Sequence, residues 1–364
     1  MSDTSHYDLL IIGAGIAGLS AAYAASRAGL HTAVIDRKKP GSGASGTPAA
    51  LLNPATGRKA KKTWQAETCL EYTKQIINEA GRYAQRPYYS ENGVIRPALD
   101  ETLAAGMLDS FRNSEWPPGW VEWISEKELK SRFPGLICKT GGLWIPVGGT
   151  VMMKDFIQAL YLCLKNEGVD FFLNSEFSCT TGTPFRTVSR SLELTAHTAI
   201  YAMGKQMTVD PLWEILPLHR VKGQTLTVKL RQRLKFNSSI SSLGYIAQTA
   251  VDPETIVLGS TYEHHFDHLN ADDEGAGYLL ERLNRTLPGI HNMITDRQGW
   301  AGVRVTVPDK KPVIGPHPEK SHLYAFCALG SKGLMLGPYL GKLLIESILN
   351  GTKIPSIFSI DRLL

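Results

Sequence analysis

The sequence predicts a mixed fold, partly α/β and partly α+β, built as two domains. Near the N-terminus, a strand, a glycine-rich turn, a helix and a second strand follow one another within residues 7–36. Between residues 223 and 263 the pattern changes to consecutive short strands. The chain has 364 residues, of which 43% are hydrophobic and 20% charged, so a large buried core is available. Because the two patterns alternate, we expect the chain to cross between the domains more than once.

The N-terminal unit has the pattern of a dinucleotide-binding domain. Residues 7–12 are mostly apolar, which is typical of a strand buried on both faces. Gly-x-Gly-x-x-Gly follows at residues 13–18, then a helix pattern ending at Gly29 and a strand ending at Asp36. In this βαβ setting the glycines form the fingerprint of a Rossmann-type domain. The alternative is that they serve only a tight turn.

Each glycine of the fingerprint has a physical role. Gly13 permits the tight turn, and Gly15 lets a pyrophosphate approach the backbone N–H groups at the positive end of the helix. Gly18 lets the helix pack closely on the strand, and Asp36 falls where a ribose hydroxyl would meet it. The fingerprint alone is compatible with NAD and with FAD.

Residues 41–54, GSGASGTPAALLNP, are too rich in small residues for an ordinary connection between a strand and a helix. Small side chains allow a ligand to lie against the main chain. The alternative is a flexible surface loop, which the apolar continuation AALL disfavours.

The remaining elements follow from hydrophobic periodicity and from turn residues. Helices are predicted at 63–81, 125–135, 152–168, 275–289 and 339–351. Strands are predicted at 88–97, 169–180, 194–204, 223–230, 242–250, 255–263 and 322–328. Between the last strand and the last helix, residues 328–338 read ALGSKGLMLGP. Glycines at such a turn indicate that a ligand approaches the backbone there as well.

Eight motifs, taken in chain order, resemble the D-amino-acid oxidase superfamily of FAD-dependent oxidoreductases, which includes glycine oxidase and sarcosine oxidase. They are GAGIAGLSAAY, VID, GASGT, GGTV, AMG, HRVKGQTL, GVRVTVPDKKPVIGP and ALGSKGLMLGP. Within that superfamily GASG, TYEHH and ALGSKGL are most similar to the oxidase half of the bifunctional enzyme that modifies the tRNA wobble uridine. That half removes a carboxymethyl group from a secondary amine on the base. The methyltransferase half has no counterpart here, so we expect a stand-alone version.

The resemblance implies a discontinuous, Rossmann-type FAD-binding domain and a second, substrate-binding domain built on an antiparallel sheet. The first comprises residues 1–82, 147–213 and 301–364, and the second comprises residues 83–146 and 214–300.

The resemblance also implies how the cofactor is held. The three fingerprint glycines bind the pyrophosphate, Asp36 binds the adenosine ribose, and the backbone of Phe177 lies near the adenine. The turn at 330–334 lies beside the N1–C2=O edge of the flavin. The expected cofactor contacts are Gly13, Gly15, Ile16, Ala17, Gly18, Asp36, Arg37, Ala44, Ser45, Gly46, Ala50, Leu51, Phe177, Ala202, Met203, Gly204, Arg304, Gly330, Ser331, Lys332, Gly333 and Leu334. Some sarcosine oxidases bind flavin covalently through a cysteine just after the equivalent of Arg304. Val305 and Thr306 stand there, so we expect non-covalent FAD.

Three side chains are predicted to act on the substrate or the reaction. Arg304 is expected to clamp a carboxylate, because its planar guanidinium can bind one bidentately; the alternative is a pair with Asp309. Tyr245 is expected to present a hydroxyl to the substrate, or else to be an ordinary strand tyrosine. Lys332 is expected to stabilise negative charge on the reduced flavin, or else to be a solvated loop residue. An acid–base residue is not required if the amine binds neutral.

These residues predict an FAD-dependent oxidoreductase that oxidises the C–N bond of a small amine or amino acid bearing a carboxylate. The first alternative is the same chemistry on 5-carboxymethylaminomethyl-uridine in tRNA. The second is a non-catalytic flavin-binding protein. Oxygen, a quinone and another protein all stay open as the electron acceptor.

Composition and charge indicate which partners and which cell compartment to expect. Net charge is +5, which permits an anionic partner, and two basic runs at residues 58–62 and 229–235 are candidates for contacts with tRNA phosphates or else ordinary solvated faces. Five scattered cysteines, the lack of a secretory leader and the lack of an apolar run long enough for a membrane span predict a cytoplasmic protein. Histidines at 264–268 are expected to be loop residues, and we expect no metal.

Overall fold

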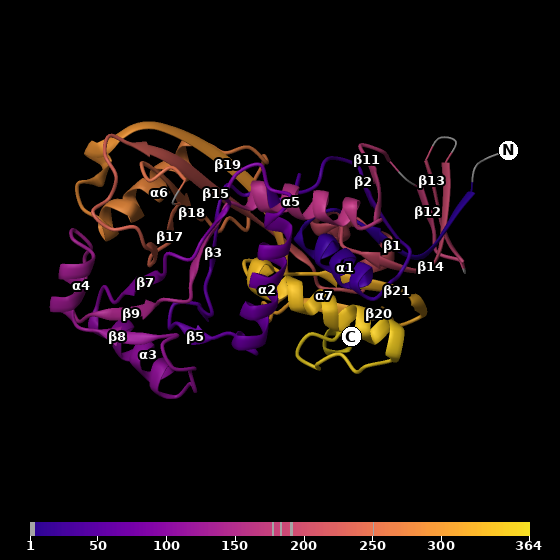
Figure 1. Cartoon of the computed structure of the whole chain (residues 1–364), viewed down its shortest axis with the longest axis horizontal. Helices are drawn as coiled ribbons and strands as arrows, with labels where there is room; N and C mark the ends of the chain where they lie inside the picture. The colour runs from indigo at the N-terminus through magenta and orange to yellow at the C-terminus, as the bar shows by residue number, and fades with distance from the viewer. Residues whose placement is uncertain (1–3, 177, 183, 190–191, 250) are drawn as a thin grey trace.

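Two large sheets organise the chain, one towards each end of an elongated molecule (Figure 1). The computed structural model describes residues 4–176, 178–182, 184–189, 192–249 and 251–364. Both sheets have eight strands. The mixed α/β and α+β fold predicted from the sequence is confirmed.

The first sheet has a parallel core, in the order β11-β2-β1-β14-β21. β13 pairs antiparallel with the N-terminal half of β14, β12 extends this hairpin, and β20 pairs antiparallel with β21. The strands of the sheet are β1 (Thr4–Ile12), β2 (Thr32–Asp36), β11 (Asp170–Leu173), β12 (Ser178–Thr180), β13 (Phe185–Ser189), β14 (Leu192–Tyr201), β20 (Val313–His317) and β21 (Lys320–Cys327).

Helices cover one face of this sheet (Figure 1), and together they bury its apolar side chains in one core. The helices of this core are α1 (Ile16–Arg27), α2 (Ala66–Gly81), α5 (Met153–Asn166) and α7 (Gly333–Asn350), of which α2 packs on α5 and α7. The other face packs against the segment that holds the short 3-10 helices η2 (Gly204–Val209) and η3 (Pro211–Trp213), where Trp213 is fully buried.

The second sheet runs in the order β19-β15-β18-β17-β16-β7-β9-β8 and is antiparallel except between β16 and β7. Helices α4 (Glu126–Arg132) and α6 (Asp273–Thr286) pack on one face, and α3 (Glu101–Arg112) packs near β7 and β9. The strands are β7 (Val94–Pro97), β8 (Glu122–Ile124), β9 (Gly142–Ile145), β15 (His219–Leu230), β16 (Ser239–Ser241), β17 (Tyr245–Gln248), β18 (Thr255–Gly259) and β19 (Ile294–Thr306).

Two small sheets and three short 3-10 helices complete the fold. The first small sheet joins β3 (Ala50–Leu52), β10 (Gly149–Val151) and β6 (Tyr89–Ser90), and the second pairs β4 (Ala55–Thr56) with β5 (Lys61–Lys62). The 3-10 helices are η1 (Ala44–Gly46), η4 (Ile290–Met293) and η5 (Ile360–Leu363).

The strands of the first sheet come from the segments 1–82, 147–213 and 301–364, as the predicted division of the chain requires. β19 does not follow the predicted division, because it belongs to the second sheet and continues past the predicted boundary at residue 300. The division into domains therefore stays a prediction.

Several elements differ from the sequence prediction. α3 was not predicted, and the strands predicted at 88–97 and 169–180 each correspond to two shorter strands, β6 and β7 in the first case and β11 and β12 in the second. α7 begins at Gly333, so that Pro338 lies inside it. Proline cannot donate the backbone hydrogen bond that the carbonyl of Leu334 would otherwise accept. The hydroxyl of Thr73 donates to that carbonyl instead, at 3.4 Å, so the helix tolerates the proline.

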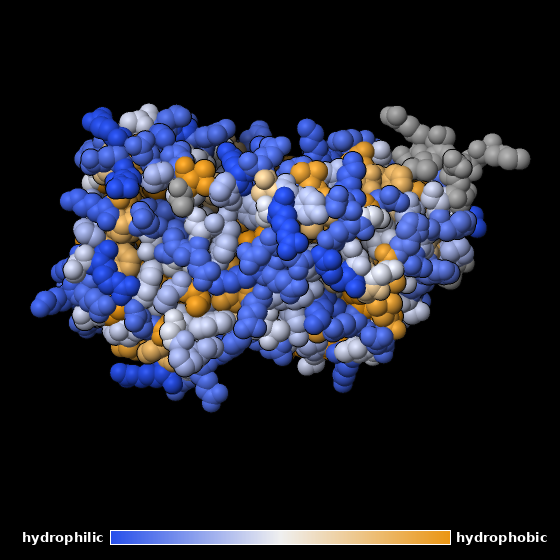
Figure 2. Space-filling view, in the orientation of Figure 1, coloured by the Kyte–Doolittle hydropathy of each residue, from blue (hydrophilic) through white to orange (hydrophobic). Residues whose placement is uncertain are grey.

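The face in Figure 2 is mainly hydrophilic, with hydrophobic residues in scattered patches. Within the described residues, no helix is long and apolar enough to cross a membrane.

The contact between α1 and α7 depends on Gly341. A Cβ atom there would lie 2.8 Å from the backbone carbonyl carbon of Ser20 on α1. We expect Gly341→Ala to lower the midpoint of thermal unfolding, with a loss of about 1–3 kcal/mol from overpacking. Gly277→Ala is the matched control, because this α6 glycine faces open space and alanine there should stabilise the helix by about 0.5–1 kcal/mol. Equal effects of the two substitutions would contradict this account of the contact.

Candidate active site

One continuous cleft of about 3060 Å³ lies between the first sheet and the second. Its wall on the first sheet is the edge where β1, β2, β14 and β21 end. Its wall on the second sheet is one face of β15 to β19, which contributes alternate residues such as Thr225, Tyr245, Trp300 and Arg304. The carboxyl edge of a parallel sheet is the usual ligand site in such folds.

The described cofactor contacts predicted from the sequence all line this cleft, with one exception. The exception is Gly18, which packs helix α1 against the turn: a Cβ atom on it would overlap the carbonyl of Gly13. Phe177 lies outside the described residues, so its predicted role near the adenine is not described here.

The fingerprint turn is held by backbone contacts that leave no room for side chains. Gly13 has a φ of +114°, and a Cβ atom on it would overlap the carbonyl oxygen of Ala202 after β14. The carboxylate of Asp36 accepts hydrogen bonds from the N–H groups of Ala14 and Lys38, both at 2.8 Å. The acid is therefore fixed at the end of β2, beside the turn.

The small-residue segment 41–54 is ordered and folds over the start of α1. It contains η1 and β3, and a Cβ atom on Gly46 would overlap the carbonyl of Gly41. The hydroxyl of Ser45 accepts the N–H of Ile16 at 3.0 Å. The segment is thus packed along the cleft and is not a flexible surface loop.

The second glycine-rich turn brings the start of α7 to the same wall. Gly330 has a φ of +55°, and Gly333 lies against the side chain of Ile16, the first residue of α1. Lys332 is half-buried and its ammonium donates to the carbonyl of Lys310 at 2.7 Å. Burial lowers the pKa of Lys332, with a further contribution from Lys310 and Lys311. Lys332 is therefore anchored at the turn and is not a freely solvated loop side chain.

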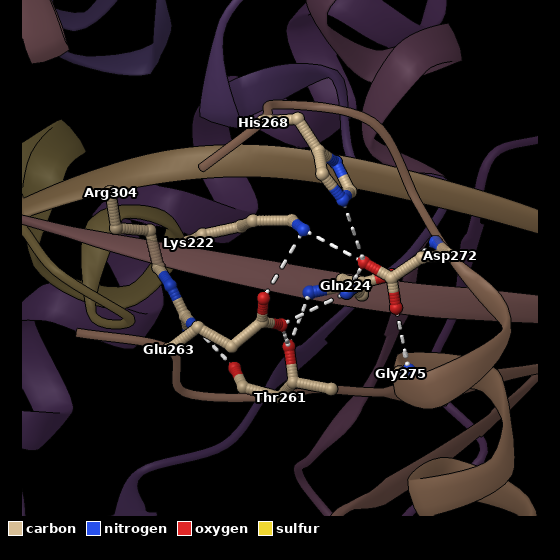
Figure 3. Close-up of polar contacts among 8 residues, drawn as sticks. All are labelled: Lys222, Gln224, Thr261, Glu263, His268, Asp272, Gly275 and Arg304. Atoms are coloured by element: carbon tan, nitrogen blue, oxygen red, sulfur yellow. Dashed lines mark hydrogen bonds and ion pairs between the residues drawn. The ribbon is translucent and has the colours of Figure 1, made fainter. Parts of the chain in front are cut away.

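Arg304 extends over Gly223 on the neighbouring strand, where any side chain would collide with the guanidinium. One of its nitrogens donates to the hydroxyl of Ser260 at 3.2 Å. Another donates to the carbonyl of Thr261 at 2.7 Å (Figure 3). The ring of Tyr262 lies 4.2 Å from its central carbon. Among the described residues Arg304 has no ion pair with a carboxylate. Some of the five N–H donors of its guanidinium therefore remain available to a ligand.

The alternative partner of Arg304, Asp309, belongs to another arginine. Arg362 binds Asp309 through two nitrogens, at 2.9 and 3.3 Å. Partial burial acts to raise the pKa of Asp309, but the hydrogen bonds from Arg362 outweigh it and the pKa is lowered. The predicted alternative of an Arg304–Asp309 pair is therefore wrong.

Two tyrosines line the cleft near Arg304, one predicted and one missed. The hydroxyl of Tyr245 donates to the carbonyl of Ala49 at 2.9 Å, and burial raises its pKa to about 12. The hydroxyl proton of Tyr245 is thus engaged in a hydrogen bond within the protein, although the ring lines the cleft. Tyr262 was not predicted as a site residue. Its signal in the sequence was the motif TYEHH, one of those that resemble the oxidase half of the tRNA-modifying enzyme.

The two basic runs lie differently. Arg58, Lys61 and Lys62 line the cleft, whereas residues 229–235 do not, and Lys229 forms ion pairs with Asp252 and Glu254. The histidines at 264–268 lie in an irregular segment. Across the described part of the chain, no group of three or more His, Cys, Asp or Glu side chains could hold a metal ion.

The fold and the cleft define a two-domain protein with a Rossmann-type dinucleotide domain facing an antiparallel sheet. The family model of the DAO FAD-dependent oxidoreductases matches residues 8–347. The chain belongs to this family, as its motifs indicated, and is an oxidoreductase.

Several known proteins are similar to this chain over most of its length. The tRNA 5-methylaminomethyl-2-thiouridine biosynthesis bifunctional protein MnmC of Thiobacillus denitrificans is 24% identical over 359 residues, which are 95% of this chain and 56% of that protein. The glycine oxidase of Bacillus licheniformis is 25% identical over 382 residues, covering 94% of this chain and 93% of that enzyme. The crystal structure of glycine oxidase from Geobacillus kaustophilus has the same fold, with a TM-score of 0.85, 21% identity and 98% of both chains covered. The chain spans about half the length of the bifunctional relatives it matches.

The Asp309–Arg362 pair can be tested by pH. Because the pKa of Asp309 is lowered by folding, its stabilisation is fully present above the unfolded value of about 3.9 and is lost as pH falls through the folded value. We expect Asp309→Asn to lower the free energy of unfolding at pH 7 by about 1 kcal/mol or less, since the pair is partly exposed. The measurement is the urea midpoint between pH 7 and pH 3. Arg362→Met should remove most of the effect of Asp309→Asn; if Arg304→Met did so instead, our assignment of the pair would be wrong.

Proposed function

We propose that this chain binds FAD non-covalently and uses it to oxidise the C–N bond of an amine that carries a carboxylate. The observation that carries the proposal is Arg304, a guanidinium that lines the cleft, is held by neutral groups and has no carboxylate partner among the described residues. Such a cation matches a substrate carboxylate in charge and in planar shape.

The residues at the first sheet fit an FAD. Gly13 and Gly15 carry no side chain of their own, the start of α1 lines the cleft with the hydroxyl of Ser45 bonded to the N–H of Ile16, and Asp36 is fixed at the end of β2. These features suit a pyrophosphate and a ribose. The start of α7, with Gly330 and Lys332, supports a place for the electron-accepting ring at the same wall. Val305 and Thr306 offer no thiol for a covalent link, and Cys327 of β21, which borders the cleft, is 4% exposed and packs in a core cluster.

Bound flavin would supply the two-electron acceptor, and the chain would orient the substrate and stabilise charge. Arg304 would hold the carboxylate so that the amine carbon faces the turn at 330–334. The N–H groups at the start of α7 and the ammonium of Lys332 would stabilise negative charge that develops there. Tyr245 would shape the pocket with its ring, since its hydroxyl donates to Ala49.

The alternative substrate is a carboxymethylaminomethyl group on a tRNA base. Two observations favour it: part of the first basic run lines the cleft, and the relatives include the bifunctional MnmC proteins of tRNA 5-methylaminomethyl-2-thiouridine biosynthesis. A free amino acid is favoured by the similarity to glycine oxidase over the whole length of that enzyme. A flavin protein without turnover is the second alternative.

The free state of all five cysteines supports the proposal that the protein acts in a reducing cytoplasm.

Anaerobic flavin bleaching separates these alternatives. Purified protein should be yellow and should release FAD into solution on heat denaturation, because the cofactor is not covalent. Glycine, sarcosine and D-amino acids test the small-substrate proposal, and tRNA carrying the modified uridine tests the alternative. Bleaching by at least one of them is expected. Colourless protein that cannot be reconstituted, or yellow protein that no substrate bleaches, would refute catalysis of this kind.

Arg304→Ala should keep FAD but weaken carboxylate substrates. Removing one partner of a desolvated ionic hydrogen bond costs about 2–5 kcal/mol, which is more than tenfold in kcat/KM. Arg304→Lys is the matched variant. Its kcat/KM should lie between that of the wild type and that of Arg304→Ala, because lysine keeps the charge but lacks the planar guanidinium. The measurements are steady-state kinetics and the flavin content of each variant. Unchanged kcat/KM in Arg304→Ala would remove the clamp from the proposal.

A further inference from the structure

We infer that Lys222, which contacts no ligand-facing group itself, is a positioning residue that sets the affinity of the Arg304 clamp for carboxylates. The inference rests on the proposed function of Arg304. It is carried by a buried charged cluster on the opposite face of the second sheet (Figure 3).

The short segment after β18, residues 260–263, is what holds Arg304. It supplies the hydroxyl of Ser260, the carbonyl of Thr261 and the ring of Tyr262, and these are the contacts of the guanidinium described above. The direction in which Arg304 points therefore depends on the position of this segment.

The segment does not follow regular strand pairing. Gly259 pairs with Thr225, and the next paired position is Glu263 with Lys222. The segment thus advances four residues while β15 advances three, which is a β-bulge. A bulge lacks part of the regular ladder of hydrogen bonds, so other contacts must fix the conformation of its extra residue.

Backbone bonds hold the segment to β15 at two places: the N–H of Thr261 donates to the carbonyl of Gln224 at 3.2 Å, and Glu263 exchanges two bonds of 2.9 Å with Lys222. Side-chain contacts on the reverse face add to these bonds. The hydroxyl of Thr261 accepts the N–H of Gln224 at 2.8 Å and donates to the carboxylate of Glu263. The same carboxylate lies 3.2 Å from the ammonium of Lys222 and accepts from the amide of Gln224 at 3.1 Å. The side chains that anchor the segment therefore meet at Lys222 and Gln224 of β15.

Lys222 links this anchor to a rigid element. Its ammonium also lies 3.0 Å from the carboxylate of Asp272, the residue that caps the start of α6 by accepting the N–H of Gly275 at 2.8 Å. That N–H and the ammonium lower the pKa of Asp272 to about 2, so the acid is ionised at neutral pH. One lysine side chain, 2% exposed, thus stands between two carboxylates that each keep less than a third of their surface exposed.

Removing the ammonium would leave two neighbouring carboxylates without their shared cation. Their repulsion would move Glu263, and with it the bulge that carries the partners of Arg304. We therefore expect the clamp to lose its geometry while the first sheet and its cleft wall stay intact.

The test uses the holoenzyme and glycolate, a small carboxylate that needs no turnover to be measured. Isothermal titration calorimetry gives its Kd for the wild type, Lys222→Met and Lys229→Met. Lys229 is the matched control, because it lies on the same strand and pairs with two carboxylates, Asp252 and Glu254, away from the clamp. We expect Lys222→Met to weaken glycolate between about tenfold and a hundredfold, with the flavin content unchanged, and Lys229→Met to bind it as the wild type does. A purely structural role of Lys222 would change the unfolding temperature and leave this affinity in place.

Glu263→Gln keeps the test open if Lys222→Met does not fold, since Lys222 still has Asp272 as a partner in that variant. It should weaken glycolate by a smaller factor. Wild-type affinity in either folded variant would overturn the inference, as would equal losses in Lys222→Met and Lys229→Met. If the wild type itself does not bind glycolate, the clamp function of Arg304 fails, and the positioning role falls with it for that distinct reason.

Discussion

Parallel hydrogen bonding among β2, β1, β14 and β21 is the interaction on which the site depends. The register pairs Ile12 with Ile35 and with Tyr201, and Tyr201 with Ala325, so these strands end at one edge. The fingerprint turn, Asp36, the residues after β14 and the second glycine turn follow these ends directly. Segments more than 300 residues apart in the sequence, at Gly13 and Gly330, therefore share one wall of a cleft. Close backbone contacts exclude side chains at the fingerprint turn, since a Cβ atom on Gly13 would overlap the carbonyl of Ala202 and one on Gly18 the carbonyl of Gly13.

The two faces of the second sheet contact different parts of the molecule. One face turns small and polar residues towards the cleft, and Gly223 leaves the space that the guanidinium of Arg304 occupies. The other face packs on α6 and buries Lys222 and Gln224 among acids. The bulge after β18 contributes groups to both faces of the sheet, because successive residues of an extended chain point to opposite sides. It bonds to Arg304 on the cleft side and to Lys222 and Gln224 on the reverse side. Charge on the hidden face can thus influence a group on the exposed one without touching a ligand.

The charge pattern around Arg304 leaves its guanidinium without an acidic partner among the described residues. Arg362 near the C-terminus takes Asp309, and the partners of Arg304 are a hydroxyl, a carbonyl and a ring. Neutral partners orient a guanidinium without cancelling its charge, which is what recognition of an anion requires. Membership of the DAO family and a fold shared with glycine oxidase agree with an oxidoreductase built on this plan.

The sequence by itself determined the elements whose signals are local. The glycine fingerprint and its flanking strands are confirmed, because glycine spacing and continuous apolar runs depend on the backbone of one short segment. α3 and the early start of α7 escaped prediction: α3 lies in a polar, aromatic-rich region, and the proline in α7 is tolerated through Thr73, which is distant in sequence. The motifs indicated Arg304, but only the tertiary structure showed that Asp309 pairs with Arg362 and not with Arg304. Only the pairing of β15 with the segment after β18 brought Lys222, Glu263 and Asp272 together. Such contacts arise from strand register and bulges, which no local pattern of residues encodes.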